Sequence, residues 1–364
     1  MIRNYPADEV AGGNGVSSAD TDKRKEKATW MSSNQNQQGW GLIGPGRFAR
    51  EFAEELREAE RARLVAVASR KKERADSFAA EFGFERAYGS YEELFADDDI
   101  DIVYIVVPHV FHREISEMAI DAGKAVVCEK PLTPGLAETD ALLQKAGEKN
   151  VFLMEAMKTG FLPAIRKAVE WIESGRIGDP VLLRADFCFR GSVDPADRLM
   201  NPDLGGGAVL DVGIYPVYLA QLLFGKPREI AAVGALAETG VEESAAIVMQ
   251  HDGGVSSSLT CSFRTEESMD AVIQGTEGEI RIPTFHAAKD VELWRNGRRV
   301  EAFSDPVGAM VGPEIEAVMD ALAAGLTECP GHDHRATRDL AGTMDEICRR
   351  MVSEEIFQRV RGGR

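Results

Sequence analysis

Cysteine is scarce in this sequence, and no two cysteines lie close together. The five residues are Cys128, Cys188, Cys261, Cys329 and Cys348. Because the Cys-X-X-Cys pairs typical of zinc and redox sites are absent, we interpret them as reduced thiols of a cytoplasmic protein. Cys128 lies at a predicted strand end, where a buried core thiol is the favoured interpretation and a reactive thiol the alternative.

Basic residues are also fewer than acidic ones. The chain of 364 residues has 42 Lys and Arg against 60 Asp and Glu, which gives a net charge of −18. Such a surface repels nucleic acids and anionic membranes, so we expect neither as a partner. The sequence lacks a run of about 18 apolar residues that would span a membrane and lacks a signal-peptide pattern. We therefore expect a cytoplasmic globular protein, and the length predicts two domains.

The first 38 residues show no sustained periodicity. They are polar and contain the basic triplet Lys23-Arg24-Lys25 and an Asn/Gln stretch at 34–38. We expect residues 1–38 to form a disordered N-terminal extension. An arm that wraps a partner subunit is the alternative.

The stretch around which the chain is organised is an apolar strand followed by glycines and a helix. Gly44, Gly46 and Ala49 have the G-x-G-x-x-G/A spacing of a dinucleotide-binding turn. Arg47 and Phe48 then begin a helix whose N-terminus favours a phosphate. The pattern predicts a dinucleotide site, with an ordinary glycine-rich loop as the alternative.

Residues 39–157 alternate between strands and helices. Strands are predicted at 64–68, 102–107, 125–128 and 151–154, with helices near 71–82, 111–122 and 136–148. The strands are continuous apolar runs, which is typical of a parallel sheet covered on both faces. We predict an N-terminal Rossmann domain with a doubly wound parallel sheet (α/β).

Residues 158–364 follow a different pattern, with half-buried alternating strands joined by tight turns. After a helix near 163–174, strands are predicted at 181–189, 229–237, 243–250, 255–263, 269–274, 279–282, 290–295 and 298–303. Asn296-Gly297 is a strong hairpin signal. We predict an α+β domain with a large, mostly antiparallel open sheet, covered on one face by helices that include two closing the chain.

The end of the second strand bears on cofactor choice. An acidic residue about 20 positions past the glycines binds the ribose of NAD, whereas an Arg there accommodates the 2′-phosphate of NADP. This chain has Ser69 and Arg70 at that place, followed by Lys71 and Lys72. We predict NADP, with NAD the less favoured cofactor and a solvated basic helix start the structural alternative.

Two further segments have residues suited to catalysis. Glu129 and Lys130 end a buried parallel strand, where ligands of such sheets bind. Asp211 and Tyr215 are four residues apart and share a face if their segment is helical. The reference pKa of tyrosine, about 10, is too high for a base at neutral pH, so a nearby lysine cation would help by stabilising the phenolate.

These motifs together resemble the Gfo/Idh/MocA superfamily of oxidoreductases. The resemblance rests on the glycine turn, the segment Pro108-His109-Val110-Phe111-His112, Glu129-Lys130-Pro131, and a G-G-G-x-x-x-D-x-G-x-Y segment that ends at Tyr215. Met154-Glu155-Ala156-Met157, Phe161-Leu162-Pro163 and Tyr215 are similar to the branch of trans-1,2-dihydrobenzene-1,2-diol dehydrogenase and NADP-dependent D-xylose 1-dehydrogenase.

The resemblance implies a dehydrogenase or reductase that acts on a CH–OH group of a sugar or cyclic diol. Its catalytic pair would be Lys130 and Tyr215, with Asp211 beside them. Cofactor contacts are expected from Gly44, Gly46, Arg47, Phe48, Ser69, Arg70, Pro108, His112, Glu129 and Lys130. Substrate contacts are expected from Lys130, Met157, Lys158, Phe161, Arg198, Asp211 and Tyr215.

Two alternative functions remain open. A reductase of a keto- or anhydro-sugar uses the same groups, and a non-catalytic NADP-binding sensor is the alternative from another class. The resemblance also implies a homodimer or homotetramer formed through the large sheet.

The chain departs from this branch at Lys158 and Gly160, where Trp and Arg are usual. Lys158 adds a cation that would favour an acidic or phosphorylated sugar, unless it is a surface lysine. His109 replaces a common Asn, and we interpret His109 and His112 as packing or nicotinamide-edge residues. His332-Asp333-His334 lacks a third ligand at suitable spacing, so no metal site is predicted.

Overall fold

A six-stranded parallel sheet forms the first part of the fold in this computed structural model, which describes residues 37–266 and 269–361. Its elements are β1 (Gln38–Ile43), α2 (Arg47–Glu58), β2 (Ala62–Ala68), α3 (Lys72–Phe82), β3 (Arg86–Tyr88), α4 (Tyr91–Phe95), β4 (Ile102–Ile105), α5 (His112–Asp121), β5 (Ala125–Glu129), α6 (Leu136–Lys149) and β6 (Leu153–Ala156). The strand order is β3-β2-β1-β4-β5-β6. The predicted extension lies, up to residue 36, outside the described residues.

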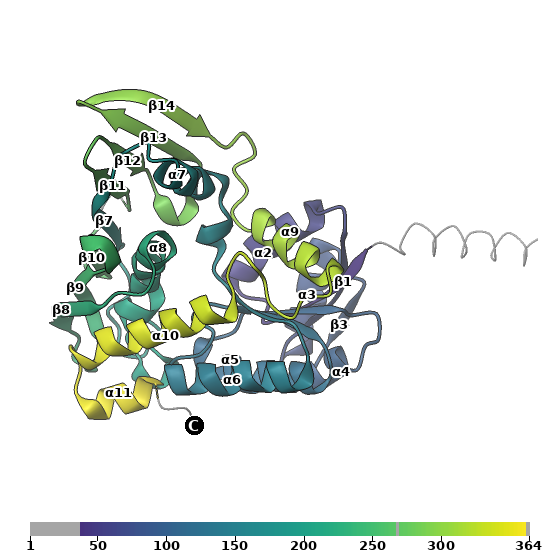
Figure 1. Cartoon of the computed structure of the whole chain (residues 1–364). Coiled ribbons are helices and arrows are strands. Elements are labelled where there is room, and N and C mark those ends of the chain that lie inside the picture. Colours follow the sequence, from purple (N-terminus) through teal and green to yellow (C-terminus); the bar gives the residue numbers. More distant parts are fainter. Residues whose placement is uncertain (1–36, 267–268, 362–364) are drawn as a thin grey trace, which may run out of the picture. The chain divides into compact units, whose positions relative to one another are not determined.

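This sheet is doubly wound, as the sequence predicts. Apolar side chains of α2 and α3 pack on one face, and those of α5 and α6 pack on the other (Figure 1). The strands are buried on both faces, which explains why they are continuous apolar runs. The sequence analysis missed β3 and α4, because a three-residue strand and a five-residue helix are too short to show a period.

The second sheet has eight strands in the order β14-β13-β12-β11-β7-β10-β9-β8. The strands are β7 (Pro180–Cys188), β8 (Glu229–Leu236), β9 (Glu242–Gln250), β10 (Ser256–Ser262), β11 (Ala271–Gly275), β12 (Glu279–Ile282), β13 (Asp290–Arg295) and β14 (Arg298–Ser304). All neighbours are antiparallel except β7 and β10, which are parallel. The helices α7 (Pro163–Glu173) and α8 (Ile214–Phe224) pack on one face in a shared core (Figure 1). The predicted mostly antiparallel sheet is therefore confirmed.

One prediction about the helices that close the chain is wrong. The sequence analysis placed both of them over the larger sheet, but α9 (Gly312–Ala323) packs into the core of the parallel sheet. The carboxylate of Glu55 on α2 accepts the backbone N–H groups of Met310, Val311 and Gly312 at 2.9, 2.8 and 2.6 Å, which caps this helix. The other helices, α10 (His334–Arg349) and α11 (Glu354–Arg361), contribute to the core of the larger sheet.

One helical stretch, Pro202–Phe224, is long and apolar enough to cross a membrane by length and composition alone, and it is the only such stretch among the residues described. In its most apolar window, 72% is buried inside the fold. The stretch ends in α8, whose side chains from Ile214 to Ala220 are all buried. Its apolar composition is that of a core helix.

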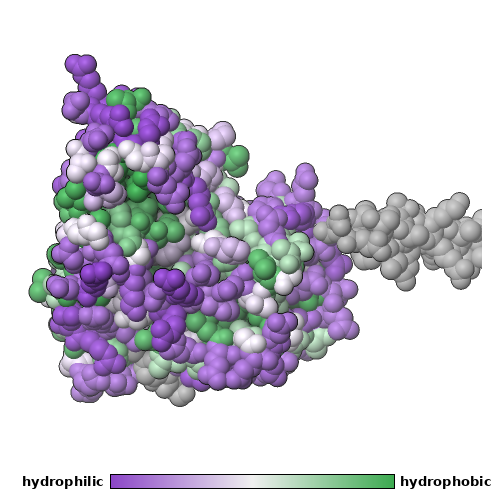
Figure 2. Space-filling view, viewed as in Figure 1, coloured by the Kyte–Doolittle hydropathy of each residue, from purple (hydrophilic) through white to green (hydrophobic). Residues whose placement is uncertain are grey.

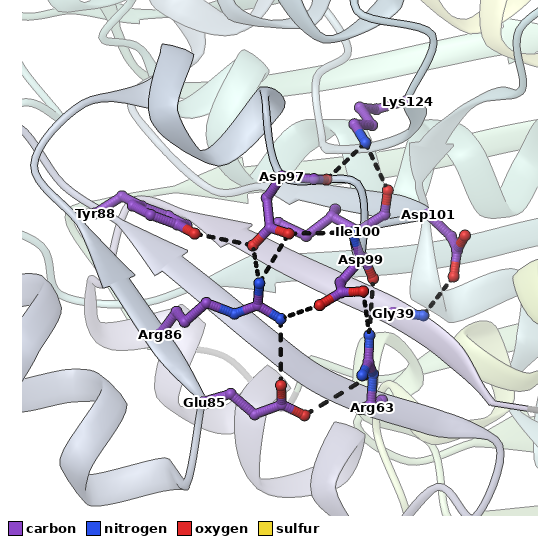
Figure 3. A network of polar contacts seen from close by, with 10 residues as sticks. All are labelled: Gly39, Arg63, Glu85, Arg86, Tyr88, Asp97, Asp99, Ile100, Asp101 and Lys124. Carbon is purple, nitrogen blue, oxygen red and sulfur yellow. Dashed lines mark hydrogen bonds and ion pairs between the residues drawn. The ribbon is translucent and has the colours of Figure 1, made fainter. Parts of the chain in front are cut away.

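Ion pairs connect the amino ends of the parallel strands (Figure 3). Arg86 on β3 pairs with Asp97 at 2.9 Å and also with Asp99. Tyr88 donates to the same Asp97 carboxylate at 2.9 Å, and Lys124 donates to the backbone carbonyl of Asp97 at 2.8 Å. These contacts occupy the edge formed by the amino ends of the strands. Ligands of such sheets bind at the opposite edge, formed by the carboxyl ends.

Candidate active site

The glycine turn has the shape that a dinucleotide pyrophosphate requires. Gly44 has φ of 93°, and a Cβ there would lie 2.6 Å from the carbonyl oxygen of Val106, so only glycine fits. At Gly46 the nearest atom to an added Cβ is 3.8 Å away, which leaves open space in front of the turn. Gly46 begins α2 without a side-chain cap, and the first turn of α2 has no acidic residue. The uncapped N–H groups therefore suit a phosphate.

The end of β2 presents cations beside this turn. The side chain of Ser69 accepts from the backbone N–H of Lys71 at 3.3 Å. Arg70 is exposed, with its guanidinium carbon 6.0 Å from the centre of the Phe111 ring. Arg74, which the sequence analysis missed, donates to the carbonyl oxygen of Pro45 in the turn at 3.1 Å. Its position one helical turn after Arg70 was the available signal.

The segment after β4 connects loops at the carboxyl ends of the strands. The ring nitrogens of His112 lie 2.8 Å from the carbonyl oxygen of Pro131 and 2.9 Å from that of Val107. Nε2 of His109 lies 2.7 Å from the carbonyl oxygen of Gly205. Burial lowers the pKa of both histidines. Both side chains have packing partners, and Pro108 before them is exposed.

The end of β5 supplies Glu129 and Lys130. Tyr104 donates its hydroxyl hydrogen to Glu129 at 2.5 Å, and burial raises the pKa of this carboxyl. The ammonium of Lys130 donates to the backbone carbonyl of Asp211 at 2.5 Å and lies 3.5 Å from the Asp211 carboxylate. The same ammonium is 4.8 Å from the centre of the Tyr215 ring. The structure therefore brings Lys130, Asp211 and Tyr215 together.

Asp211 lies on a short π-helical turn, Val209–Gly213, which leads directly into α8. Such turns are frequent at functional sites. Arg198 donates to the Asp211 carboxylate at 3.2 Å. Burial would raise the pKa of Asp211, but the positive charges of Lys130 and Arg198 outweigh burial and lower it to about 2. The carboxylate therefore stays ionised at neutral pH, opposite the Lys130 ammonium.

Tyr215 is 9% exposed and lies among aromatic rings. The centre of the Phe187 ring is 5.2 Å away, and that of the His286 imidazole is 6.0 Å away. Burial raises the pKa of Tyr215 well above its ordinary value, so the phenol is protonated in the resting site. His286 was missed by the sequence analysis, because it lies in a turn between strands and belongs to no motif.

Lys158 and Gly160, the departures from the family pattern, lie directly after β6. The Lys158 side chain is buried, so its interpretation as a surface lysine is wrong. A Cβ at position 160 would lie 1.9 Å from the hydroxyl of Tyr218, so Gly160 is required by this close approach. Met157 is fully buried in the core of the larger sheet, and Phe161 packs in the core of the parallel sheet. The structure therefore places Met157 and Phe161, both predicted substrate contacts, among core residues.

The His332-Asp333-His334 triplet has structural partners. His332 lies 3.0 Å from the Glu155 carboxylate, and His334 lies 2.9 Å from the carbonyl oxygen of Leu153. Asp333 caps α10 by accepting from the backbone N–H of Ala336 at 2.7 Å. Within residues 37–266 and 269–361, no group of three metal-ligating side chains is present. Cys128 is buried, which fits a core thiol, and burial raises its pKa.

The fold and this site define an oxidoreductase with a nicotinamide-dinucleotide-binding domain. A model of an oxidoreductase family with an NAD-binding Rossmann fold matches residues 39–157, and a GFO/IDH/MocA C-terminal domain model matches residues 165–281. The chain belongs to the Gfo/Idh/MocA oxidoreductase family. The resemblance stated from the motifs is confirmed.

Curated relatives share most of the chain. Trans-1,2-dihydrobenzene-1,2-diol dehydrogenase of Mus musculus is 38% identical over 304 residues, covering 80% of this chain and 90% of the relative. The enzyme of the same name from Homo sapiens is 33% identical over 322 residues, covering 85% and 95%.

Solved structures share the fold. KijD10, a 3-ketoreductase from Actinomadura kijaniata in complex with NADP and TDP-benzene, is 27% identical with a TM-score of 0.79, covering 87% of this chain and 98% of that one. Levoglucosan dehydrogenase, in complex with NADH and levoglucosan, has a TM-score of 0.77 at 22% identity and covers 86% and 97%, which shows the fold alone.

Proposed function

We propose that this chain is an NADP-dependent oxidoreductase that interconverts a CH–OH group and a carbonyl on a sugar or cyclic diol. The observation that carries the proposal is the Lys130 ammonium, 4.8 Å from the Tyr215 ring at the carboxyl end of β5. The diol dehydrogenase names of the curated relatives support the substrate class. Solved forms of the KijD10 ketoreductase in complex with NADP include two mutants of one lysine and one mutant of a tyrosine, which supports testing this pair.

The residues divide the chemistry between them. A nicotinamide dinucleotide would be held by the turn of Gly44 and Gly46 and by Arg70, and it would supply the hydride-transfer chemistry. Tyr215 donates its hydroxyl proton to the carbonyl oxygen in reduction and takes the proton back in oxidation. The Lys130 cation stabilises the phenolate, and Asp211 holds that cation in place. Because burial keeps the phenol protonated, the resting site is ready for proton donation to a carbonyl.

A panel of sugars and diols, each tested with NADP and NAD at the nicotinamide absorbance, tests this proposal. Oxidation of at least one diol or sugar, or reduction of the matching ketone, is the expected result. The 3-ketoreductase named among the solved structures favours including keto-sugars with NADPH. Tight NADP binding without turnover of any member of the panel would contradict the proposal.

Cofactor choice depends on Arg70 in this proposal. Arg70 lies just after β2, and its guanidinium is over the Phe111 ring. From there the guanidinium can donate two hydrogen bonds to a 2′-phosphate. We expect Arg70→Ala to lower the ratio of NADP to NAD affinity about tenfold or more, because a loss of this size corresponds to the free energy of one charge-assisted contact. Calorimetric titration of each dinucleotide measures this ratio.

Lys72→Ala is the matched control for Arg70→Ala. It removes the same charge from the same segment, but the Lys72 ammonium is paired with Asp76 on the same helix. We expect this variant to keep the native ratio of affinities. An equal loss of NADP and NAD affinity in Arg70→Ala would show that Arg70 does not contact the 2′-phosphate.

Association through the larger sheet also belongs to the proposal. In the space-filling view, apolar side chains reach the surface at the left, over the strands of this sheet (Figure 2). Val233 on β8 is 72% exposed, and Val248 on β9 is 52% exposed. Val248 lies opposite Ala231 and Ser258, and Val233 lies opposite Ala246, so small side chains flank the two valines and let a second copy pack closely against them. The occupant we propose is the same face of another subunit.

A charge placed on this face tests the oligomer. We expect Val248→Glu to convert a dimer or tetramer into smaller species, because burying an unpaired carboxylate in the interface is unfavourable. Light scattering after size-exclusion chromatography measures the mass. Val307→Glu, at an exposed valine outside the sheet, is the control. A native chain that is monomeric would contradict this part of the proposal.

A further inference from the structure

Lys158 is a buried cation without an anionic partner. Its side chain is 8% exposed, and its ammonium forms no ion pair with any carboxylate of the described residues. The ammonium donates to the sulfur of Met310 at 3.8 Å and lies 4.9 Å from the centre of the Phe48 ring. A methionine sulfur and an aromatic face compensate poorly for the lost hydration of an ammonium. The Lys158 ammonium therefore lacks a partner that compensates for its lost hydration.

The position of this ammonium connects it to the active site. Phe48 is the second residue of α2 and directly follows the glycine turn. Lys158 comes shortly after β6, which pairs with β5, and Lys130 directly follows β5. The ammonium therefore lies at the carboxyl edge of the parallel sheet, between the dinucleotide turn and the proposed catalytic pair.

A second unpartnered group lies on the adjacent segment. Thr159, next to Lys158, donates to the carbonyl oxygen of His286 at 3.4 Å, so the two turns are in contact. Nδ1 of His286 is buried and has no hydrogen-bond partner among the described residues. The His286 ring stacks on Phe187 and meets the edge of Tyr215. Burial and, to a smaller extent, the positive charges of Lys158 and Lys130 lower the pKa of this histidine to about 4.

Carboxyl groups near Lys158 do not replace the missing partner. Burial lowers the pKa of Lys158, and the charges of Glu129, Glu51 and Glu314, which form no ion pair with it, offset this lowering only in part. Glu129 is already bonded to Tyr104, and burial raises the pKa of Glu314 well above its usual range, which disfavours its charged form. The ammonium is left as the charge available to a bound anion.

We propose that the substrate of this enzyme has an anionic group, a carboxylate or a phosphate, which binds Lys158 while Tyr215 faces the reacting carbon. His286 Nδ1 supplies a polar contact to the same substrate. This inference rests on the proposed function and narrows its substrate class from neutral diols and sugars to acidic ones. The related branch has an Arg in this segment, but Gly160 has no side chain, so Lys158 supplies the positive charge here.

Three matched probes test the proposal: glucose, glucuronate and glucose 6-phosphate. With the native enzyme and NADP, we expect kcat/KM to be higher for one anionic probe than for glucose. In Lys158→Met, the ratio of anionic to neutral kcat/KM is expected to fall about 10- to 100-fold, the value of one charge-assisted contact. Lys158→Arg should retain most of the ratio, and Lys167→Met, at a lysine on the surface of α7, should retain all of it. The probe with the larger fall identifies the anion as carboxylate or phosphate.

Calorimetric binding of each probe to the enzyme–NADPH complex gives a readout that does not need turnover. We expect Lys158→Met to weaken binding of the anionic probe by the same factor. If no probe reacts, the binding comparison still decides the role of Lys158, while the panel of sugars and diols decides the proposed function. An unchanged ratio in Lys158→Met, or equal loss for neutral and anionic probes, would overturn the inference.

Discussion

Tyr215→Phe is expected to lower kcat by about 10²- to 10⁴-fold, the usual contribution of a positioned proton donor. The substitution removes one oxygen from a ring that keeps its contacts with Phe187 and His286. NADPH affinity should stay within about twofold of native, because the dinucleotide turn lies on the other sheet. Stopped-flow measurement of hydride transfer, together with fluorescence titration of NADPH, separates the two effects.

Tyr218→Phe provides the matched control for this experiment. Tyr218 lies on the same helix and is buried, and its hydroxyl has no hydrogen-bond partner among the described residues. Loss of that hydroxyl should leave kcat near its native value. If Tyr215→Phe retained more than a tenth of the native rate, the proton would have to come from another group.

The parallel sheet was predictable because its physical signal is strong. Strands such as β4 are buried on both faces and appear as unbroken apolar runs. The glycine turn was equally predictable, because Gly44 requires a backbone conformation that other residues rarely adopt. Short elements were not, since β3 has three residues and shows no period.

Long-range packing was harder to predict than local structure. The apolar stripe of α9 was visible, but a stripe does not say which core it joins, and α9 joins the parallel sheet. The π-helical turn at Asp211 was also invisible, because a single wide turn leaves no repeating pattern.

The site was predictable in part. Lys130 and Asp211 are 81 residues apart, and only the family resemblance indicated that they meet. Arg74 had a local signal, one turn beyond Arg70, that the sequence analysis did not use. His286 had none, because the turn that contains it gains its role only when it packs beside Tyr215.

The pH dependence of the reaction depends on Lys130. In the proposed oxidation Tyr215 takes up the hydroxyl proton and must first be deprotonated, so we expect the rate to rise with pH until the phenol has lost its proton. The Lys130 cation favours the phenolate and therefore lowers the pKa of Tyr215 relative to the same site without a cation. Removing the cation raises that pKa, so the rising limb of the oxidation profile moves to higher pH.

Lys130→Met is therefore expected to lower kcat for oxidation at neutral pH by about 10²- to 10³-fold, comparable with the loss of one preorganised electrostatic contact. Part of this loss should be recovered at alkaline pH, because hydroxide removes the proton that the native site releases more easily. Lys130→Arg keeps the charge opposite Asp211 and should retain a rising limb closer to that of the native enzyme. Profiles of kcat against pH for the three proteins measure the shift. A rate in Lys130→Met that is low but has the native pH dependence would assign Lys130 to positioning Asp211 instead, because the loss of a positioning contact does not change the proton affinity of Tyr215.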